Sequence, residues 1–277
     1  MKKIFLALLL LCLAAPAFAA DAPKESVYDR VMRTGTIRCG YFLYPPALMK
    51  DPNTGAMSGI YYDYIEQLGH NLHLKIDWAE EIGLGDYPTA LQNGRIDAMC
   101  SSIWINGARA RAHDFVSPLF YLPLYLYTRT GDTRFDKDPM LLNDPKYKLA
   151  ILEGGATDII RREMFPKSGD YTLPQTTSPA ELFLSLGASK ADAVIYEPLT
   201  FSFFDKANPG KIRQASAKPV KVFASAIPVK HGEEAFRRML SLATQEMQLS
   251  GSAEKILKKY ETQKGAIYRV STPYQEP

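Results

Sequence analysis

The stretch LQNGRIDAM, residues 91–99, occurs a second time in altered form as LGASKADAV, residues 186–194. Both stretches share a leucine, a basic residue four positions later, an Asp-Ala pair and a following apolar residue at identical spacing. This pattern predicts the end of a helix, a tight turn and the start of a buried strand. Its two occurrences indicate that the chain builds the same kind of α/β unit twice, once in each of two lobes.

Strand and helix signals alternate around both stretches. Residues 36–42 predict a buried strand that ends at Tyr44-Pro45-Pro46, because proline cannot continue a central ladder. A helical pattern over residues 59–72 precedes a strand at 74–78. In the second half, a strand at 148–152 runs into a helix, and a capping box at 178–181 predicts another. The predicted fold class is α/β, with mostly parallel sheets flanked by helices.

Two extended segments, residues 122–129 and 222–228, flank the second α/β unit. We expect them to form the two connections of a hinge, so that lobe 2 is an insertion within lobe 1. Helical patterns from 233 to 249 and around 256–260 then complete lobe 1. The predicted boundaries are 20–127 plus 226–277 for lobe 1 and 128–225 for lobe 2.

The N-terminus carries an export signal. Lys2 and Lys3 precede an apolar run over 4–15 and the sequence Ala17-Phe18-Ala19, which together predict a secretory signal peptide cleaved after Ala19. The run is too short to span a membrane, which takes about 20 apolar residues. We therefore expect a soluble periplasmic protein. Loss of Lys2 and Lys3 lowers the formal charge from +3 to +1, and this balance, without a basic stripe, argues against nucleic acid as a partner.

Two cysteines, Cys39 and Cys100, belong to the predicted mature chain. An oxidising exported compartment permits them to pair. Both fall on predicted strands, so a disulfide is geometrically possible if those strands are neighbours. Two buried free thiols that pack as small hydrophobes are an equally good interpretation.

Several short motifs follow one another in an informative order. They are GTIR at 35–38, YPP at 44–46, GIYYD at 59–63, SSIWIN at 101–106 with Arg109, DFVSPLFY at 114–121, EGGAT at 153–157 and DAVIYEP at 192–198. Together they resemble the type 2 periplasmic solute-binding proteins of the polar amino-acid class, family 3, which are receptors of ABC importers. The resemblance implies a two-lobed fold that closes by a hinge around an amino acid or related carboxylate. It also implies an ABC permease in the inner membrane as partner.

The resemblance also indicates residues that contact the ligand. Arg109 matches the family's carboxylate-binding arginine, and a guanidinium pairs well with a carboxylate through two hydrogen bonds. Ser101 and Ser102 follow a strand at its carboxyl end, where open α/β sheets bind ligands. Glu197 matches the acid that holds the ligand's ammonium group. The alternatives are a solvated Arg109, simple strand termination at the serines, and a Glu197 that stabilises the helix starting at Pro198.

The remaining candidates form a backbone site and an aromatic wall. The glycine-rich turn before a predicted helix, including Gly155 and Ala156, allows backbone N–H groups to approach an anion. Tyr44 and Tyr87 are candidates for stacking on the ligand, although core packing also explains such tyrosines. Trp104 is a candidate donor through its indole N–H. Trp104, Gly155 and Ala156 stand where the family usually has hydroxyl residues, and Leu84 lies near an expected aromatic. These departures predict a drier site and a larger or partly aromatic carboxylate ligand.

Two other functions fit the same fold. Periplasmic cyclohexadienyl dehydratases share it, and Glu197 in a desolvated cleft is a candidate general acid with a raised pKa. A sensor that docks on a membrane receptor is the other alternative. The sequence contains no H-E-x-x-H, G-x-S-x-G or P-loop motif. We therefore predict a binding protein that is not an enzyme and needs no metal or cofactor.

Overall fold

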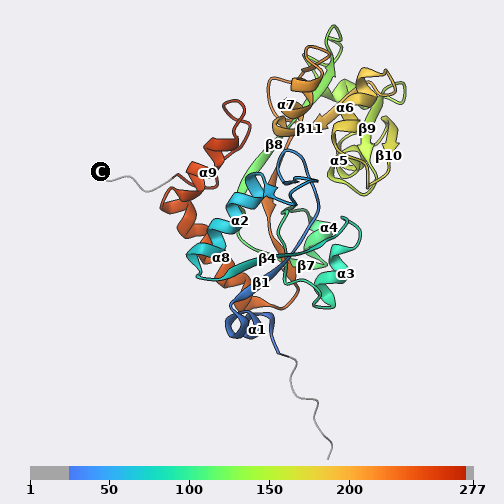
Figure 1. The fold of residues 1–277 in the computed structure, drawn as a ribbon. Coiled ribbons are helices and arrows are strands. Elements are labelled where there is room, and N and C mark those ends of the chain that lie inside the picture. Colours follow the sequence, from blue (N-terminus) through green and yellow to red (C-terminus); the bar gives the residue numbers. More distant parts are fainter. Residues whose placement is uncertain (1–24, 273–277) are drawn as a thin grey trace, which may run out of the picture.

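The computed structural model describes residues 25–272, and the predicted signal peptide lies outside this range. The chain forms two lobes, which Figure 1 shows with the first lobe at the bottom and the second at the top. The helices are α1 (Val27–Thr34), α2 (Ile60–Asn71), α3 (Tyr87–Gln92), α4 (Gly107–Ala110), the 3-10 helix η1 (Pro139–Leu142), α5 (Ala156–Met164), α6 (Ala180–Gly187), α7 (Pro198–Ala207), α8 (Glu234–Leu249) and α9 (Ser252–Tyr260). The strands are β1 (Thr36–Tyr41), β2 (Met49–Lys50), β3 (Met57–Ser58), β4 (Lys75–Glu81), β5 (Ala98–Met99), β6 (Ile103–Trp104), β7 (His113–Phe115), β8 (Phe120–Arg129), β9 (Lys148–Leu152), β10 (Gly169–Leu173), β11 (Ala193–Tyr196), β12 (Ile212–Gln214), β13 (Lys221–Ala226) and β14 (Pro228–Lys230).

Each lobe is organised around its own sheet. The first-lobe sheet has the order β4-β1-β5-β14-β7, and β1 runs parallel to both β4 and β5. The second sheet has the order β10-β9-β11-β8-β13-β6, and β9 runs parallel to β10 and β11. Helix α2 packs on β4, α8 and α9 in the first lobe, whereas α5 and α6 pack on β9 in the second. The predicted two-lobed α/β class is confirmed, but the sheets are mixed and not mostly parallel. Strands β14 and β7 join the first sheet, and β8, β13 and β6 the second, by antiparallel pairing, because β8 and β13 pass between the lobes in opposite directions.

Strands β8 and β13 connect the lobes. The ten-residue strand β8 leaves the first lobe and enters the second, and β13 returns beside it in antiparallel pairing from Lys221–Leu124 to Ser225–Phe120 (Figure 1). The C-terminal segment adds a bridge from Tyr268 to Tyr121. The second lobe is therefore inserted between two strands that form the predicted hinge. The boundaries at 127/128 and 225/226 stay a prediction.

The repeated stretch has the same structure in both lobes. Helix α3 ends near Gly94, which has a left-handed φ of 72°, and β5 follows; α6 ends near Ser189, with a φ of 59°, and β11 follows. The shared aspartates have the same role. Asp97 accepts the backbone N–H of Arg38 at 2.6 Å, and Asp192 accepts that of Lys148 at 2.9 Å. The predicted sequence of helix end, turn and strand is confirmed.

The predicted capping box before α6 is wrong. The helix itself forms, but its N-cap is Pro179 and no side chain caps it. Ser178 therefore lies one position before the N-cap, and only its backbone carbonyl is used, accepting a hydrogen bond from the N–H of Glu181. Because the helix begins one residue later than the box requires, the reciprocal side-chain bonds do not form.

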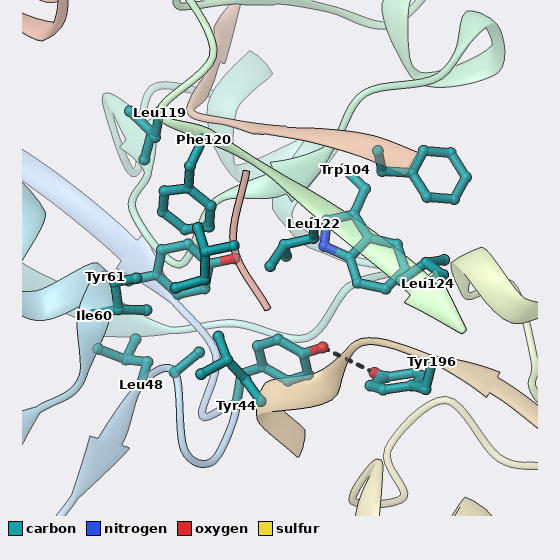
Figure 2. Close-up of a cluster of buried hydrophobic side chains, with 14 of the residues drawn as sticks. Tyr44, Leu48, Ile60, Tyr61, Trp104, Leu119, Phe120, Leu122, Leu124 and Tyr196 are labelled. Carbon is teal, nitrogen blue, oxygen red and sulfur yellow. Dashed lines mark hydrogen bonds between the residues drawn. The ribbon is translucent and has the colours of Figure 1, made fainter. Parts of the chain in front are cut away.

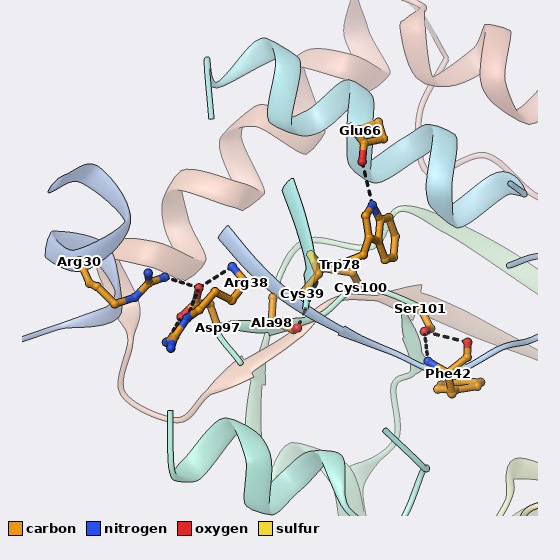
Figure 3. Close-up of a disulfide and its surroundings, with 10 residues drawn as sticks. All are labelled: Arg30, Arg38, Cys39, Phe42, Glu66, Trp78, Asp97, Ala98, Cys100 and Ser101. Carbon is orange, nitrogen blue, oxygen red and sulfur yellow. Dashed lines mark hydrogen bonds and ion pairs between the residues drawn. A yellow bond between two sulfur atoms is a disulfide. The ribbon is translucent and has the colours of Figure 1, made fainter. Parts of the chain in front are cut away.

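Cys39 and Cys100 form a disulfide in the first lobe. They lie on neighbouring elements, because Cys39 pairs with Ala98 of β5 and Cys100 comes just after that strand. Their Cα atoms are 5.4 Å apart. Figure 3 shows this bond beside the cluster in which Asp97 binds Arg30 and Arg38. Of the two interpretations that the sequence allows, the structure has the disulfide.

Candidate functional site

A cavity of about 550 Å³ lies between the lobes. The first lobe lines it with the loop after β1, the loop after β4, strand β6 and Arg109, and the second lobe with the start of α5, the loop before α6 and Tyr196. Sites for small organic ligands usually measure roughly 300–1,000 Å³. The cavity is therefore large enough for a molecule of amino-acid size, and both lobes contribute to it.

Aromatic side chains form much of the wall. They are Phe42, Tyr44, Tyr61, Trp104 and Tyr196. Trp104 stacks on Phe223 with ring centroids 5.3 Å apart, and its centroid lies 5.9 Å from that of Tyr196. Figure 2 shows Trp104 on one side of this cluster and Tyr44 on the other, with Tyr196 facing Tyr44. Such a wall favours a ligand with an apolar or planar portion.

Arg109 is the cation of the cavity lining. It lies on the short helix α4, where the side chain of Asn106 accepts the Arg109 N–H at 2.9 Å and so fixes the turn. One guanidinium nitrogen, Nη1, donates to the carbonyl oxygen of Trp104 at 2.9 Å. Within residues 25–272 no carboxylate pairs with Arg109, and burial lowers its pKa. Since an arginine stays charged in proteins, its other N–H groups are available to an anion.

The electrostatic effect of Arg109 extends to its neighbours. His113 is buried, and both this burial and the charge of Arg109 lower its pKa. Tyr87 packs against the His113 ring with centroids 5.0 Å apart. The neutral form of His113 is thus favoured and carries no charge, so Arg109 supplies the positive charge on this side of the cavity. The first-lobe wall is therefore suited to an anionic group of a ligand.

The start of α5 supplies a second anion-binding element from the other lobe. Gly155 is the N-cap of this helix and no side chain caps it; Gly155, Ala156 and Thr157 line the cavity. Gly154 has a left-handed φ of 65°, which favours glycine. A Cβ on Gly155 would lie 3.1 Å from the carbonyl oxygen of Leu152, so this tight turn also suits glycine there. The positive end of the helix dipole thus adds to Arg109 from across the cavity.

Two acidic residues contribute the opposite charge. Glu81 and Asp86 line the cavity from the end of β4 and the loop that follows. The neighbouring Glu80 pairs with Arg95, whereas Glu81 and Asp86 have no ion-pair partner in the described part of the chain. The lining therefore offers both a cation and carboxylates, as a zwitterionic ligand requires.

Six of the nine predicted site residues line the cavity: Tyr44, Ser102, Trp104, Arg109, Gly155 and Ala156. Ser102 belongs to a polar cluster at the hinge, where its hydroxyl donates to the carbonyl of Ala226 at 2.9 Å and lies 2.7 Å from the Ser225 hydroxyl. The Tyr61 hydroxyl lies 3.0 Å from the same Ser225 oxygen. This cluster ties β6 and α2 to the hinge strand β13.

The other three predicted residues are not part of the lining. Tyr87 packs on His113, and the Ser101 hydroxyl binds the backbone N–H and carbonyl of Phe42 at 2.7 and 3.1 Å. Glu197 is 1% exposed and lies against Tyr44. Their roles as direct ligand contacts stay predictions. The structure instead adds Phe42, Tyr61 and Tyr196, two of which belong to motifs already singled out, GIYYD and DAVIYEP.

Glu197 has an unusual environment for a carboxylate. It is the N-cap of α7, and its Oε2 accepts the N–H of Thr200 at 3.0 Å. Its Oε1 accepts the Tyr44 hydroxyl at 2.9 Å and also the Thr200 hydroxyl. Burial raises the pKa of Glu197 to about 7, although these hydrogen bonds act in the opposite direction.

No group of His, Cys, Asp and Glu side chains within residues 25–272 has the arrangement of a metal site. No helix in that range combines the length and the apolar character needed to cross a membrane.

Known proteins that are similar to this chain include two amino-acid-binding proteins and a solved structure. The L-arginine-binding protein of Pseudomonas aeruginosa is 28% identical over 94% of this chain and 96% of its own length. The ABC transporter glutamine-binding protein GlnH of Bacillus subtilis is 24% identical over 94% of this chain and 97% of its own. A crystal structure of the ancestral amino-acid-binding protein AncCDT-1, a precursor of cyclohexadienyl dehydratase, matches 85% of this chain and 99% of its own with a TM-score of 0.72 and 22% identity.

The family model for bacterial extracellular solute-binding proteins, family 3, matches residues 37–263. This range contains both hinge strands, every residue that lines the cavity and both sheets apart from Thr36, the first residue of β1. The chain therefore belongs to the family 3 bacterial extracellular solute-binding proteins.

Proposed function

We propose that this protein is the periplasmic receptor of an ABC importer and captures an amino acid or related carboxylate by closing its lobes. The observation that carries this proposal is the position of Arg109, which lines the inter-lobe cavity without a carboxylate partner among the described residues. The uncapped start of α5 lines the same cavity from the other lobe. A ligand carboxylate between them would receive charged and backbone hydrogen bonds from both lobes, which favours the closed form.

The rest of the lining supports a large ligand side chain. The aromatic wall suits an apolar or planar portion, and Glu81 and Asp86 suit a cationic group. Relatives named for arginine and glutamine are similar over nearly their whole length. We therefore propose L-arginine as the first ligand to test, with L-phenylalanine as the aromatic alternative.

A receptor role also fits the expected location. The predicted signal peptide directs export, and the closed lobes would then dock on a permease in the inner membrane. The dehydratase alternative gains little from the geometry, because a general acid must reach its substrate and Glu197 is not part of the cavity lining. Binding without turnover is the function we propose.

Calorimetric titration of the purified mature protein with the standard amino acids tests this proposal. The protein should be unfolded and refolded first, so that ligand carried over from the host is removed. We expect at least one amino acid to bind. Arg109→Met should then weaken its affinity by about thirtyfold or more, because truncating one partner of a buried charge pair typically costs about 2–5 kcal/mol.

Arg111→Met is the matched control, since Arg111 is exposed and close in sequence. It should leave the affinity within about twofold of the wild type, as is usual for an exposed charge. Equal affinities for the Arg109→Met variant and the wild type would contradict the assignment of Arg109. Failure of every amino acid to bind would contradict the proposed function itself.

A further inference from the structure

We propose that Glu197 and Tyr44 form a latch between the lobes, and that Glu197 promotes ligand binding by holding Tyr44 in the cavity wall and not by contacting the ligand. Tyr44 lies in the loop after β1 of the first lobe, whereas Glu197 begins α7 of the second. Their hydrogen bond, 2.9 Å between the Tyr44 hydroxyl and Glu197 Oε1, therefore crosses from one lobe to the other.

The carboxylate has little capacity left for a ligand. Oε1 already accepts two hydroxyl groups, those of Tyr44 and Thr200, and Oε2 accepts the backbone N–H of Thr200. Glu197 is 1% exposed and is absent from the cavity lining, which includes Tyr44 and the adjacent Tyr196. A ligand ammonium group could reach Glu197 only if Tyr44 moved away.

The latch also connects directly to the wall that the ligand meets. The Tyr44 hydroxyl lies 3.1 Å from the Tyr196 hydroxyl, and the two rings approach edge to face at 6.5 Å. Figure 2 shows this pair closing the lower side of the aromatic cluster. Separation of the lobes would break the contact between Tyr44 and Glu197. The hydrogen bond thus couples the shape of the cavity wall to lobe closure.

The groups around Glu197 carry no positive charge within the described chain. Facing it are Tyr44 from the loop after β1, Tyr61 from α2, Tyr127 from β8, and Tyr196 and Thr200 from its own lobe. Burial in this apolar and phenolic environment favours the protonated acid, which raises the pKa of Glu197 to about 7. A protonated or hydrogen-bonded Glu197 can hold Tyr44, whereas a ligand's ammonium group would need a charged carboxylate.

A measurement without ligand tests the latch directly. Spin labels on Asn93→Cys and Thr172→Cys, both exposed and on different lobes, report the distance between lobes by pulsed electron resonance. The native cysteines are paired and remain unlabelled. We expect Tyr44→Phe and Glu197→Leu each to shift the ligand-free population towards longer distances. The double variant should shift it no further than Tyr44→Phe alone, because Tyr44→Phe already removes the bond to Glu197.

Tyr64→Phe is the matched control. It also removes a buried tyrosine hydroxyl from the first lobe, but the polar neighbour of this hydroxyl, Gln248, lies on α8 of the same lobe. The control should keep the wild-type distance distribution. If Tyr44→Phe also keeps it, the latch is overturned, whatever the protein binds. If Glu197→Leu fails to fold, Tyr196→Phe replaces it: this variant removes the hydroxyl contact between Tyr44 and Tyr196 but keeps the bond to Glu197, and it should keep the wild-type distances.

A second measurement separates positioning from direct contact, and this arm rests on the proposed function. Titrations use L-arginine and its deaminated analogue 5-guanidino-2-oxopentanoate as probes. We expect Tyr44→Phe to weaken both by a similar factor, about tenfold, as for the loss of a hydrogen bond to a charged or buried acid. Glu197→Gln keeps an acceptor for Tyr44 and should stay within about threefold of the wild type for both.

Direct contact with the ammonium group predicts a different pattern. Glu197→Gln would then weaken L-arginine by about thirtyfold or more and leave the deaminated analogue unchanged, because only the first probe carries the α-ammonium group. That result would overturn the positioning role. If neither probe binds the wild type, the proposed ligand is wrong, and the ligand-free distances still decide the latch.

Discussion

Removal of the disulfide between Cys39 and Cys100 should destabilise the first lobe strongly. The perturbation is the double variant Cys39→Ala/Cys100→Ala, since a single replacement would leave a free thiol. The two cysteines are separated by 61 positions, and the loop between them contains α2, β4, α3 and β5. Without the bond, the unfolded chain regains the freedom of this whole loop.

The size of the effect follows from the loop length. The chain-entropy relation gives about 4 kcal/mol at 25 °C for a closed loop of this size. Both sulfur atoms are also buried, so their removal adds a smaller packing loss. The expected decrease in the free energy of unfolding is therefore about 4 kcal/mol, a large part of the roughly 5–15 kcal/mol that stabilises a typical protein.

Urea unfolding of the ligand-free protein, followed by tryptophan fluorescence, measures this change. With a urea m-value of about 3 kcal/mol/M, the midpoint should fall by about 1.3 M. Reduction of the wild type by dithiothreitol should produce a similar shift. A midpoint shift below about 0.3 M would refute the reasoning. So would two reactive thiols in the denatured, unreduced wild type, because the bond would then be absent.

Two further predictions concern buried carboxylates. Glu197 keeps its proton up to a pH of about 7 in the folded state but loses it near pH 4.5 in the unfolded state. Its contribution to the free energy of unfolding is therefore complete below pH 4.5. This contribution falls by about 3 kcal/mol as the pH rises to 7 and stays constant above that. Urea unfolding across this range should show the decline relative to Glu197→Gln, and parallel curves for the two proteins would contradict it. Asp97→Ala should lower the free energy of unfolding by about 3–5 kcal/mol, because it removes the fully buried carboxylate that pairs with Arg30 and Arg38. Asp192→Ala, at the equivalent and more exposed position of the second lobe, should cost less, and equal losses would argue against burial as the cause.

Local sequence signals predict much of the architecture. The stretches at 91–99 and 186–194 each form a helix end, a turn and a strand start, because apolar spacing and a turn residue act over a few neighbouring positions. The extended segments that flank the second unit become the hinge strands β8 and β13. Arg109 and the glycine-rich turn before α5 are also visible in the sequence, and both line the cavity.

Other features depend on residues that are far apart in the sequence. Even the capping box, which is a local signal, does not determine where its helix begins: α6 starts one residue later than the box requires, so the predicted capping does not form. The cysteines pair because β1 and β5 are neighbours in the sheet, which their own sequence cannot specify. Phe42, Tyr61 and Tyr196 enter the cavity wall through the approach of three separate elements.

Glu197 shows most clearly the difference between what the sequence determines and what the tertiary structure determines. The sequence by itself determined that an acid follows the strand in DAVIYEP and precedes a helix that begins with proline. Only the tertiary structure decided that Tyr44, 153 positions earlier, occupies one of its oxygens from the other lobe. The physical reason is that a carboxylate's solvation and hydrogen-bond partners are set by packing between lobes. Residue type and spacing determine which groups are present, and the fold determines which of them meet.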